Sequence, residues 1–348
     1  MSTYSQAGVD IDAGERAVEL MKAHLKKARR PEVIGDIGGF AGLFDVSALK
    51  KFKKPLLATS TDGVGTKTEI ARQLNKYDTI GEDLVAMVVD DLVVCGAEPL
   101  FMTDYIAVGK VFPERIAEIV SGIARGCEKA GTALIGGETA EHPGLLKEDE
   151  FDIAGAATGA VDEENLLGEH RIKEGDVLIA MPASGFHANG YSLIRYILNN
   201  QKLKLDEKIT NKTLGEILIT PTEIYSLDCL ALARGMKEEL HAFSHITGGG
   251  LAENTARVIP NGLTATFDRS TWELPPAVAY LAEAGAVPQE DLERTWNAGI
   301  GMVAIVAKDS ADLALKSLAA RGMQGWVAGV IQKGTGAKAS LEGRYRPR

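Results

Sequence analysis

The chain has 348 residues, with 38 Lys and Arg against 48 Asp and Glu, so its formal net charge is −10. This length predicts about two domains. The 45% hydrophobic and 25% charged fractions are ordinary for a globular protein, whereas the 38 glycines are in excess. An acidic chain lacks the basic face of a general nucleic-acid or membrane-surface binder, so we expect neither partner, although a local pocket could hold a small anion.

The cysteines and the N-terminal sequence indicate in which cellular compartment the protein lies. Cys95, Cys127 and Cys229 have neither metal-ligand spacing nor the even number of a disulfide framework. The first residues lack the pattern of a signal peptide, and the longest apolar run, residues 84–89, is too short to span a bilayer. These features predict a soluble, cytoplasmic protein.

Strand and helix patterns alternate along the chain. In the first half we expect helices over 14–27, 81–94 and 113–129 and strands over 55–61, 100–108, 133–135 and 152–161. The charged segment 162–175 is the predicted domain boundary. In the second half we expect strands over 177–182, 263–267 and 302–307 and helices over 191–198, 221–240, 275–284 and 310–321. This alternation predicts α/β or α+β layers in both halves.

Several common motifs are absent. The chain has no G-x-x-x-x-G-K-[ST] loop, no G-x-G-x-x-G after a strand and no G-x-S-x-G. His241 and His245 have the i, i+4 spacing of zinc ligands on a helix, but no third ligand has suitable spacing. We favour a structural or surface role for this pair over a metal site.

Acidic residues beside glycines are the first candidates for ligand chemistry. Asp62 precedes a glycine loop ending in Lys67, which suits a phosphate or a metal as well as a plain turn. Asp90 and Asp91 lie in a helix that is apolar nearly all round, where a carboxylate needs a cation, a partner or a solvated edge. Glu138 follows a short strand and two glycines. Such carboxylates suit Mg²⁺ that carries nucleotide phosphates.

A polar loop over 184–190 opens a helix in the second half. Free N–H groups at a helix start can bind an anion, and His187 could bond a phosphate or transfer a proton near neutral pH. An N-cap by Asn189 with a solvent-facing histidine is an equally weighted alternative. The glycine-rich loops at 247–250 and 297–301 allow close approach to a ligand.

A series of motifs in chain order carries a resemblance to a known family. The motifs are GVDIDAGE, RRPEVIGDIGGFAGLF, STDGVGTK, DTIGEDLVAM, GAEPLFMTDY, GGETAEHPG, SGFHANGYSL, ITGGGLAEN and WNAGIGM. The series resembles the phosphoribosylformylglycinamidine cyclo-ligases, or aminoimidazole ribonucleotide synthetases, of purine biosynthesis. The resemblance covers residues 8–330, essentially the whole chain.

The resemblance implies an ATP-dependent ligase that closes a ring. ATP phosphorylates the formyl oxygen of formylglycinamidine ribonucleotide, the amidine nitrogen attacks, and phosphate leaves to give 5-aminoimidazole ribonucleotide and ADP. Mg²⁺ is implied as the metal. The implied fold has an N-terminal ATP- and magnesium-binding domain over 1–168, whose four-stranded sheet pairs in a homodimer into an eight-stranded barrel. A C-terminal α/β domain over 169–348 completes the substrate site.

Matching the motifs residue by residue implies site roles. The catalytic candidates are Lys67 and His187, and the metal candidates are Asp62, Asp91 and Glu138. The nucleotide candidates are Gly38, Gly39, Asp62, Gly63, Gly65, Thr66, Lys67, Asp91, Gly136, Gly137, Glu138 and Thr139. The substrate candidates are Ser184, Gly185, His187, Asn189, Gly190, Thr247, Gly248, Gly249 and Gly250.

Two positions depart from the family's pattern, and two other functions stay open. The family commonly has Asn at the position of Asp90 and Met at that of His142, so we favour Asp91 as the metal ligand and assign His142 no catalytic role. Another ATP-using relative, a small-molecule kinase or a selenophosphate synthetase, is one alternative; the latter needs a reactive cysteine earlier than Cys95. A non-catalytic nucleotide-binding protein is the other.

Overall fold

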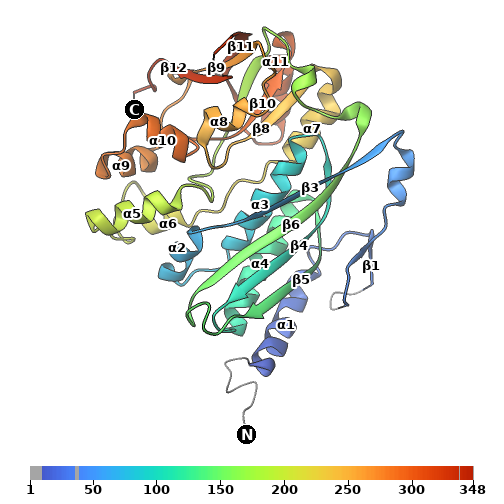
Figure 1. Cartoon of the computed structure of the whole chain (residues 1–348), viewed down its shortest axis with the longest axis vertical. Helices are drawn as coiled ribbons and strands as arrows, with labels where there is room; N and C mark the ends of the chain where they lie inside the picture. The colour runs from blue at the N-terminus through green and yellow to red at the C-terminus, as the bar shows by residue number, and fades with distance from the viewer. Residues whose placement is uncertain (1–9, 36–38, 337, 348) are drawn as a thin grey trace. The chain divides into compact units, whose positions relative to one another are not determined.

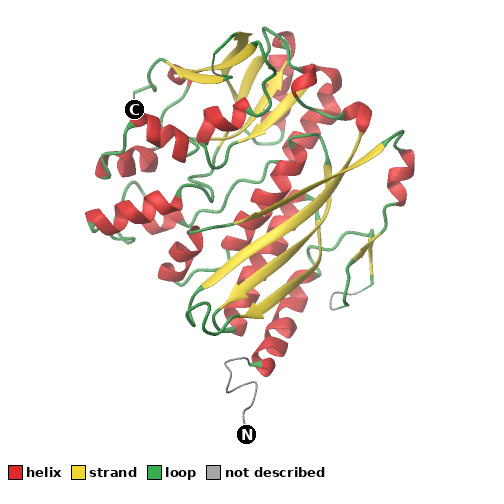
Figure 2. Ribbon diagram, in the orientation of Figure 1, coloured by secondary structure: helices red, strands yellow, loops and turns green. Residues whose placement is uncertain are grey.

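The computed structural model describes residues 10–35, 39–336 and 338–347. The chain forms two compact units: one runs to Leu92 and resumes over Ala97–Glu163, and the other joins Val93–Gly96 to the segment that starts at Glu164. Each unit combines helices with a sheet (Figures 1 and 2), which confirms the mixed α/β class. Among the described helices, none has the length and apolar character needed to cross a membrane.

The first unit is built on a four-stranded sheet of order β3-β6-β4-β5. Strand β6 (Phe151–Asp162) runs antiparallel to both β3 (Pro55–Gly63) and β4 (Glu98–Val108), and the edge strand β5 (Ala133–Glu141) runs parallel to β4. The unit also contains α1 (Ile11–Leu25), β1 (Val33–Ile34), β2 (Leu43–Phe44), α2 (Lys67–Leu74), α3 (Ile80–Val93) and α4 (Pro113–Ala130).

The two faces of this sheet differ in burial. On β4, Met102, Ile106 and Val108 are buried, and in Figure 1 α3 and α4 lie behind the sheet. The alternate residues of β4 point to the other face. Tyr105 on that face is 42% exposed, and Leu57 on β3 is 68% exposed. The period of two in this strand therefore separates a helix-covered face from an open face.

The second unit contains a six-stranded sheet of order β12-β9-β11-β7-β10-β8. Its strands are β7 (Val177–Pro182), β8 (Leu240–His245), β9 (Leu263–Asp268), β10 (Ile300–Val306), β11 (Trp326–Lys333) and β12 (Ala339–Glu342). Its helices are α5 (Tyr191–Gln201), α6 (Leu214–Leu218), α7 (Ser226–Met236), α8 (Gly250–Ala256), α9 (Pro276–Ala284), α10 (Gln289–Thr295) and α11 (Ala311–Ala320). Strand β10 is buried along its whole length, because alternate side chains enter two hydrophobic clusters on opposite faces.

Two element predictions that bear on the site were wrong. Strand β5 continues from Ala133 to Glu141, so the Gly136-Gly137 pair and Glu138 lie within a strand and not after it; pairing with β4 overrides the weak strand propensity of glycine. Asp62 likewise lies within β3.

The predicted helix over 221–240 is restricted to α7, because Lys237 adopts a left-handed φ of 51° that ends it. His241 and His245 therefore lie on strand β8 and not on a helix. The Nδ1 of His241 lies 2.6 Å from Oδ2 of Asp176, with both side chains buried. This contact supports the structural role that we favoured over zinc.

A buried ion pair joins α2 to α3. Nζ of Lys67 donates to Oδ1 of Asp83 at 2.8 Å, and both side chains have no exposed surface. Burial lowers the pKa of the Lys67 ammonium, and the Asp83 carboxylate opposes this shift. Lys67, which the family resemblance gave as a catalytic candidate, thus has its ammonium group buried against Asp83 in this structure.

We expect Asp83→Ala to lower the free energy of unfolding by about 3–5 kcal/mol, because a buried ammonium would lose its carboxylate. Urea unfolding followed by circular dichroism measures the change. Lys76→Met is the matched control, since the Lys76–Asp78 pair is roughly half exposed and such pairs contribute under about 1 kcal/mol. Equal effects of the two substitutions would contradict a structural role for the buried pair.

Candidate functional site

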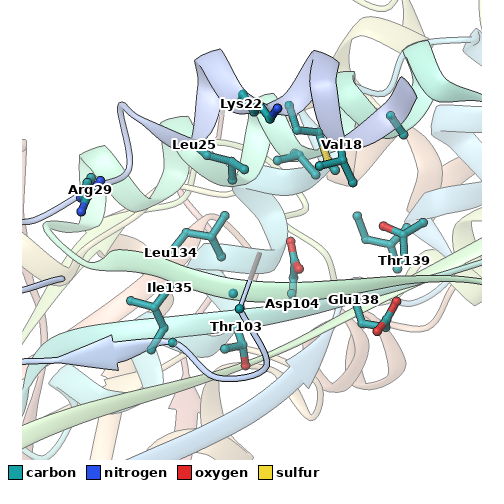
Figure 3. A pocket seen from close by; sticks show the side chains of 18 of the residues that line it. Val18, Lys22, Leu25, Arg29, Thr103, Asp104, Leu134, Ile135, Glu138 and Thr139 are labelled. Carbon is teal, nitrogen blue, oxygen red and sulfur yellow. The ribbon is translucent and has the colours of Figure 1, made fainter. Parts of the chain in front are cut away.

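A pocket of about 890 Å³ opens in the first unit around the edge strand β5 (Figure 3). Helix α1, the glycine-rich segment after it, α4 and strands β4 and β5 all contribute walls. Much of the lining is aliphatic, including Val18, Met21, Ile106 and Leu134. A concave, largely apolar site with a few polar groups is typical of a site for a small organic ligand.

Cations line one side of the pocket. Lys22 lies in the last turn of α1, Lys26 is its C-cap residue, and Arg29 follows three residues later. The guanidinium of Arg29 donates to the carbonyl oxygen of Gly35 at 2.5 Å, which ties Gly35 to this side. Positive side chains beside glycine backbone are suited to an anionic group such as a phosphate.

One carboxyl group points into the pocket from β4. Figure 3 shows Asp104 directed toward α1, whereas the neighbouring Thr103 points away from it. Removal from water raises the pKa of Asp104 to about 7, and a hydrogen bond from its own backbone N–H only partly opposes the shift. This group therefore titrates near neutral pH.

The pocket collects only part of the predicted nucleotide site. Of those residues, it is lined by Gly39, Gly136, Gly137, Glu138 and Thr139. Gly38 lies outside the described residues. The remaining candidates, which are not among its lining residues, are Asp62, Gly63, Gly65, Thr66, Lys67 and Asp91.

Four charged residues of the pocket, Lys22, Lys26, Arg29 and Asp104, were not predicted from the sequence, although two signals pointed to them. Lys22, Lys26 and Arg29 are three cations close together in sequence at the end of a predicted helix. Asp104 occupies an inward position of a strand that otherwise alternates apolar residues on that face, and this exception marks it as unusual.

Sheet register separates the predicted metal ligands. Asp62 pairs with Gly155, and Gly155 pairs with Asp104, so both carboxylates point to the helix-covered face. Asp91 on α3 lies on the same side of the sheet, because Ser60, which shares the face of Asp62 on β3, donates to its Oδ2 at 3.4 Å. Glu138 pairs with Tyr105 and points to the open face.

Within the described ranges, no three His, Cys, Asp or Glu side chains gather closely enough to hold a metal ion. In this structure Asp62, Asp91 and Glu138 are thus not gathered around one point, and their role as metal ligands stays a prediction. The sequence could not reveal this separation, because the register of a strand decides to which face of the sheet each side chain points. Asp90 is fully buried, whereas its neighbour Asp91 is exposed.

The predicted substrate loops come together in the second unit. A Cβ at Gly248 would lie 3.7 Å from the amide oxygen of Asn189, and Asn297 donates to the carbonyl of Gly185 at 2.8 Å. Loops 184–190, 247–250 and 297–301 are therefore neighbours. Asn254 holds the second loop by donating to the carbonyls of Thr247, Gly248 and Gly250.

His187 lies buried at the centre of these loops. It has a left-handed φ of 60°, and the backbone N–H of Ser184 donates to its Nε2 at 3.3 Å. A side chain at Gly301 would place Cβ 2.5 Å from the imidazole and 2.0 Å from the hydroxyl of Tyr225, so only glycine fits. The alternative with a solvent-facing histidine and an Asn189 cap is wrong, because the cap residue of α5 is Gly190.

Comparisons with known proteins agree across both units. Residues 45–161 match the N-terminal domain of AIR synthase related proteins, and residues 173–342 match their C-terminal domain. A phosphoribosylformylglycinamidine cyclo-ligase of Desulfitobacterium hafniense is 51% identical over 94% of this chain and 96% of its own length. The cyclo-ligase of Geobacillus kaustophilus is 48% identical over 98% of this chain and 99% of its own length.

Solved structures share the fold at lower identity. Thiamine-monophosphate kinase from Stenotrophomonas maltophilia superposes with a TM-score of 0.67 at 19% identity, over 94% of this chain and 96% of its own. The hydrogenase maturation protein HypE in complex with ATP superposes with a TM-score of 0.66 at 16% identity, over 94% and 91%. Near-full-length identity of about one half, with both domains matched, shows that this chain belongs to the phosphoribosylformylglycinamidine cyclo-ligase family.

Proposed function

We propose that this chain closes the imidazole ring of 5-aminoimidazole ribonucleotide from formylglycinamidine ribonucleotide and ATP, a step of purine biosynthesis in the cytoplasm. The observation that carries the proposal is the 51% identity with a named cyclo-ligase over 94% of the chain. The chain is therefore a ligase enzyme. We assign ATP handling to residues 1–168 and the completion of the substrate site to residues 169–348.

The pocket around β5 supports the binding of ATP. Its aliphatic walls suit the faces of a base, and Lys22, Lys26 and Arg29 suit the phosphates. These cations stabilise the charge that develops as the terminal phosphoryl group moves to the formyl oxygen. The nucleophile is part of the substrate, so the protein's main task in ring closure is to position it.

The loops around His187 support the binding of the substrate. Helix α5 begins directly after Gly190, and its first N–H groups suit the sugar phosphate. His187 is held by Ser184 within the same loop, which places an imidazole, a group able to accept and donate a proton, among the substrate loops. We assign proton handling during ring closure to this residue.

Asp62 and Asp91 support a magnesium role better than Glu138 does. Both are exposed carboxylates on the same face of the sheet, and Mg²⁺ is commonly held by one or two carboxylates together with phosphate oxygens. Bound there, the ion shields phosphate charge. Glu138 lies on the open face, and we assign it to the nucleotide pocket instead.

The open face of the sheet supports a homodimer. It exposes Leu57 and Tyr105 beside small residues such as Thr59, Ala154 and Thr158. A second copy of this face would bury these side chains and complete an eight-stranded barrel across the interface. Small residues permit close approach of the two sheets.

The reaction is tested by incubating the purified chain with ATP, Mg²⁺ and formylglycinamidine ribonucleotide. We expect an aromatic amine, detected by diazotisation, only when all three are present. His187→Asn should lower kcat at least tenfold, and His170→Asn, at an exposed histidine of the same unit, is the control. A phosphorylated product without amine would favour a kinase, and ATP binding without any turnover would favour a non-catalytic protein.

For the metal assignment, we expect Asp62→Asn and Asp91→Asn to raise the Mg²⁺ concentration for half-maximal rate at least tenfold, because each removes a charged oxygen ligand. Glu138→Gln should leave that concentration nearly unchanged. Steady-state rates over a Mg²⁺ titration measure it, with melting temperatures as a check on folding. The same Mg²⁺ dependence in all three variants would reject the assignment.

For the dimer, we expect Leu57→Lys to shift the protein to a monomer in analytical ultracentrifugation, because a charge would be buried at the interface. Leu145→Lys is the matched control, as Leu145 is 78% exposed in a turn. A wild-type protein that sediments as a monomer at micromolar concentration would contradict the proposal.

A further inference from the structure

We propose that Asp104 reads the hydrogen-bonding edge of the nucleotide base and so makes the pocket select adenine over guanine. The inference rests on the proposed function, because it takes the pocket around β5 as the nucleotide site. It goes further by assigning one residue to base specificity.

Space for the Asp104 carboxyl group is built into the sheet. Asp104 on β4 pairs with Gly137 on β5, and a Cβ at Gly137 would lie 1.7 Å from Oδ1 of Asp104. Any residue but glycine would therefore displace the carboxyl group. The glycine leaves it lying over β5, where it opens to the pocket (Figure 3).

Asp104 lies among aliphatic side chains in the wall of the pocket. Met102 and Ile106 on the same face are buried aliphatic residues, and Val120 and Leu134 complete the wall from α4 and β5. Among the described residues, no side chain forms a hydrogen bond or ion pair with Asp104; its bond is to its own backbone N–H. Asp104 is only partly buried, and a carboxyl group has more hydrogen-bonding capacity than this one bond uses, so a partner can reach it from the pocket.

The chemistry of a carboxyl group in this setting matches adenine. When protonated, it offers one O–H donor and one carbonyl acceptor, and apolar burial is a known means of keeping an Asp protonated for this purpose. Adenine presents an acceptor, N1, next to a donor, the N6 amino group, so two hydrogen bonds form. Guanine presents two adjacent donors, N1–H and N2–H₂, which instead match an ionised carboxylate.

This complementarity predicts a preference that depends on pH. Because the pKa of Asp104 is raised to about 7, the form that suits adenine dominates below that pH and is lost above it. Among the residues that the structure describes, the other ionisable groups around the pocket are Lys22, Lys26 and Arg29 on the α1 side, Glu138 on β5, and the thiol of Cys127, which burial keeps protonated.

The test measures equilibrium binding of ATP and GTP by calorimetry between about pH 6 and about pH 8. We expect the wild-type preference for ATP to fall as the pH rises. Asp104→Asn keeps a donor and an acceptor without a titrating proton, so its preference should not change with pH. Asp104→Leu has similar size but no hydrogen bonds, and we expect it to bind ATP roughly ten- to thirtyfold more weakly.

Asp152→Asn is the control, because Asp152 is an exposed carboxylate on β6 and is not among the pocket residues. Melting temperatures verify folding of each variant. An ATP-to-GTP ratio that is the same in the wild type and in folded Asp104→Leu would overturn the inference while leaving the cyclo-ligase function intact. Failure of the wild type to bind either nucleotide would overturn the nucleotide pocket itself, and the inference with it.

Discussion

The register of β4 between its two neighbours is the constraint on which the first unit depends. Residues paired across a sheet point to the same face, so the pairings place Asp62, Gly155, Asp104 and Gly137 in one row. That row faces the helices, and the next row carries Tyr105 and Glu138 to the open face. A shift of one residue would exchange the two sets, and with them the pocket and the proposed dimer surface.

Glycine has the same physical role in both units. Gly137 leaves room for the Asp104 carboxyl group, and Gly301 leaves room for His187 and the hydroxyl of Tyr225. In each case a missing side chain lets an ionisable residue lie where a larger neighbour would exclude it. The glycine excess of the chain is thus partly explained by two sites that need ionisable groups in confined space.

Strongly patterned elements could be predicted from the sequence, and weakly patterned ones could not. The predicted strand at 177–182 coincides with β7, and the helix at 113–129 differs from α4 by one residue, because apolar periodicity and a proline start are local signals. The glycine-rich half of β5 and the histidine-bearing β8 carry no such signal. Both are strands because a neighbouring strand pairs with them.

The sequence by itself determined the fold class, the family and the order of the motifs, since composition, periodicity and motif series are properties of the chain. Through the family resemblance it also implied a shared substrate role for loops 184–190 and 247–250. Only the tertiary structure decided that Glu138 and Asp62 face opposite sides, that Lys67 is buried against Asp83, and that Asp104 enters a pocket with Lys22 and Arg29. The physical reason is that the sheet face to which a side chain points, and its burial, depend on strand register and on packing between residues far apart in sequence.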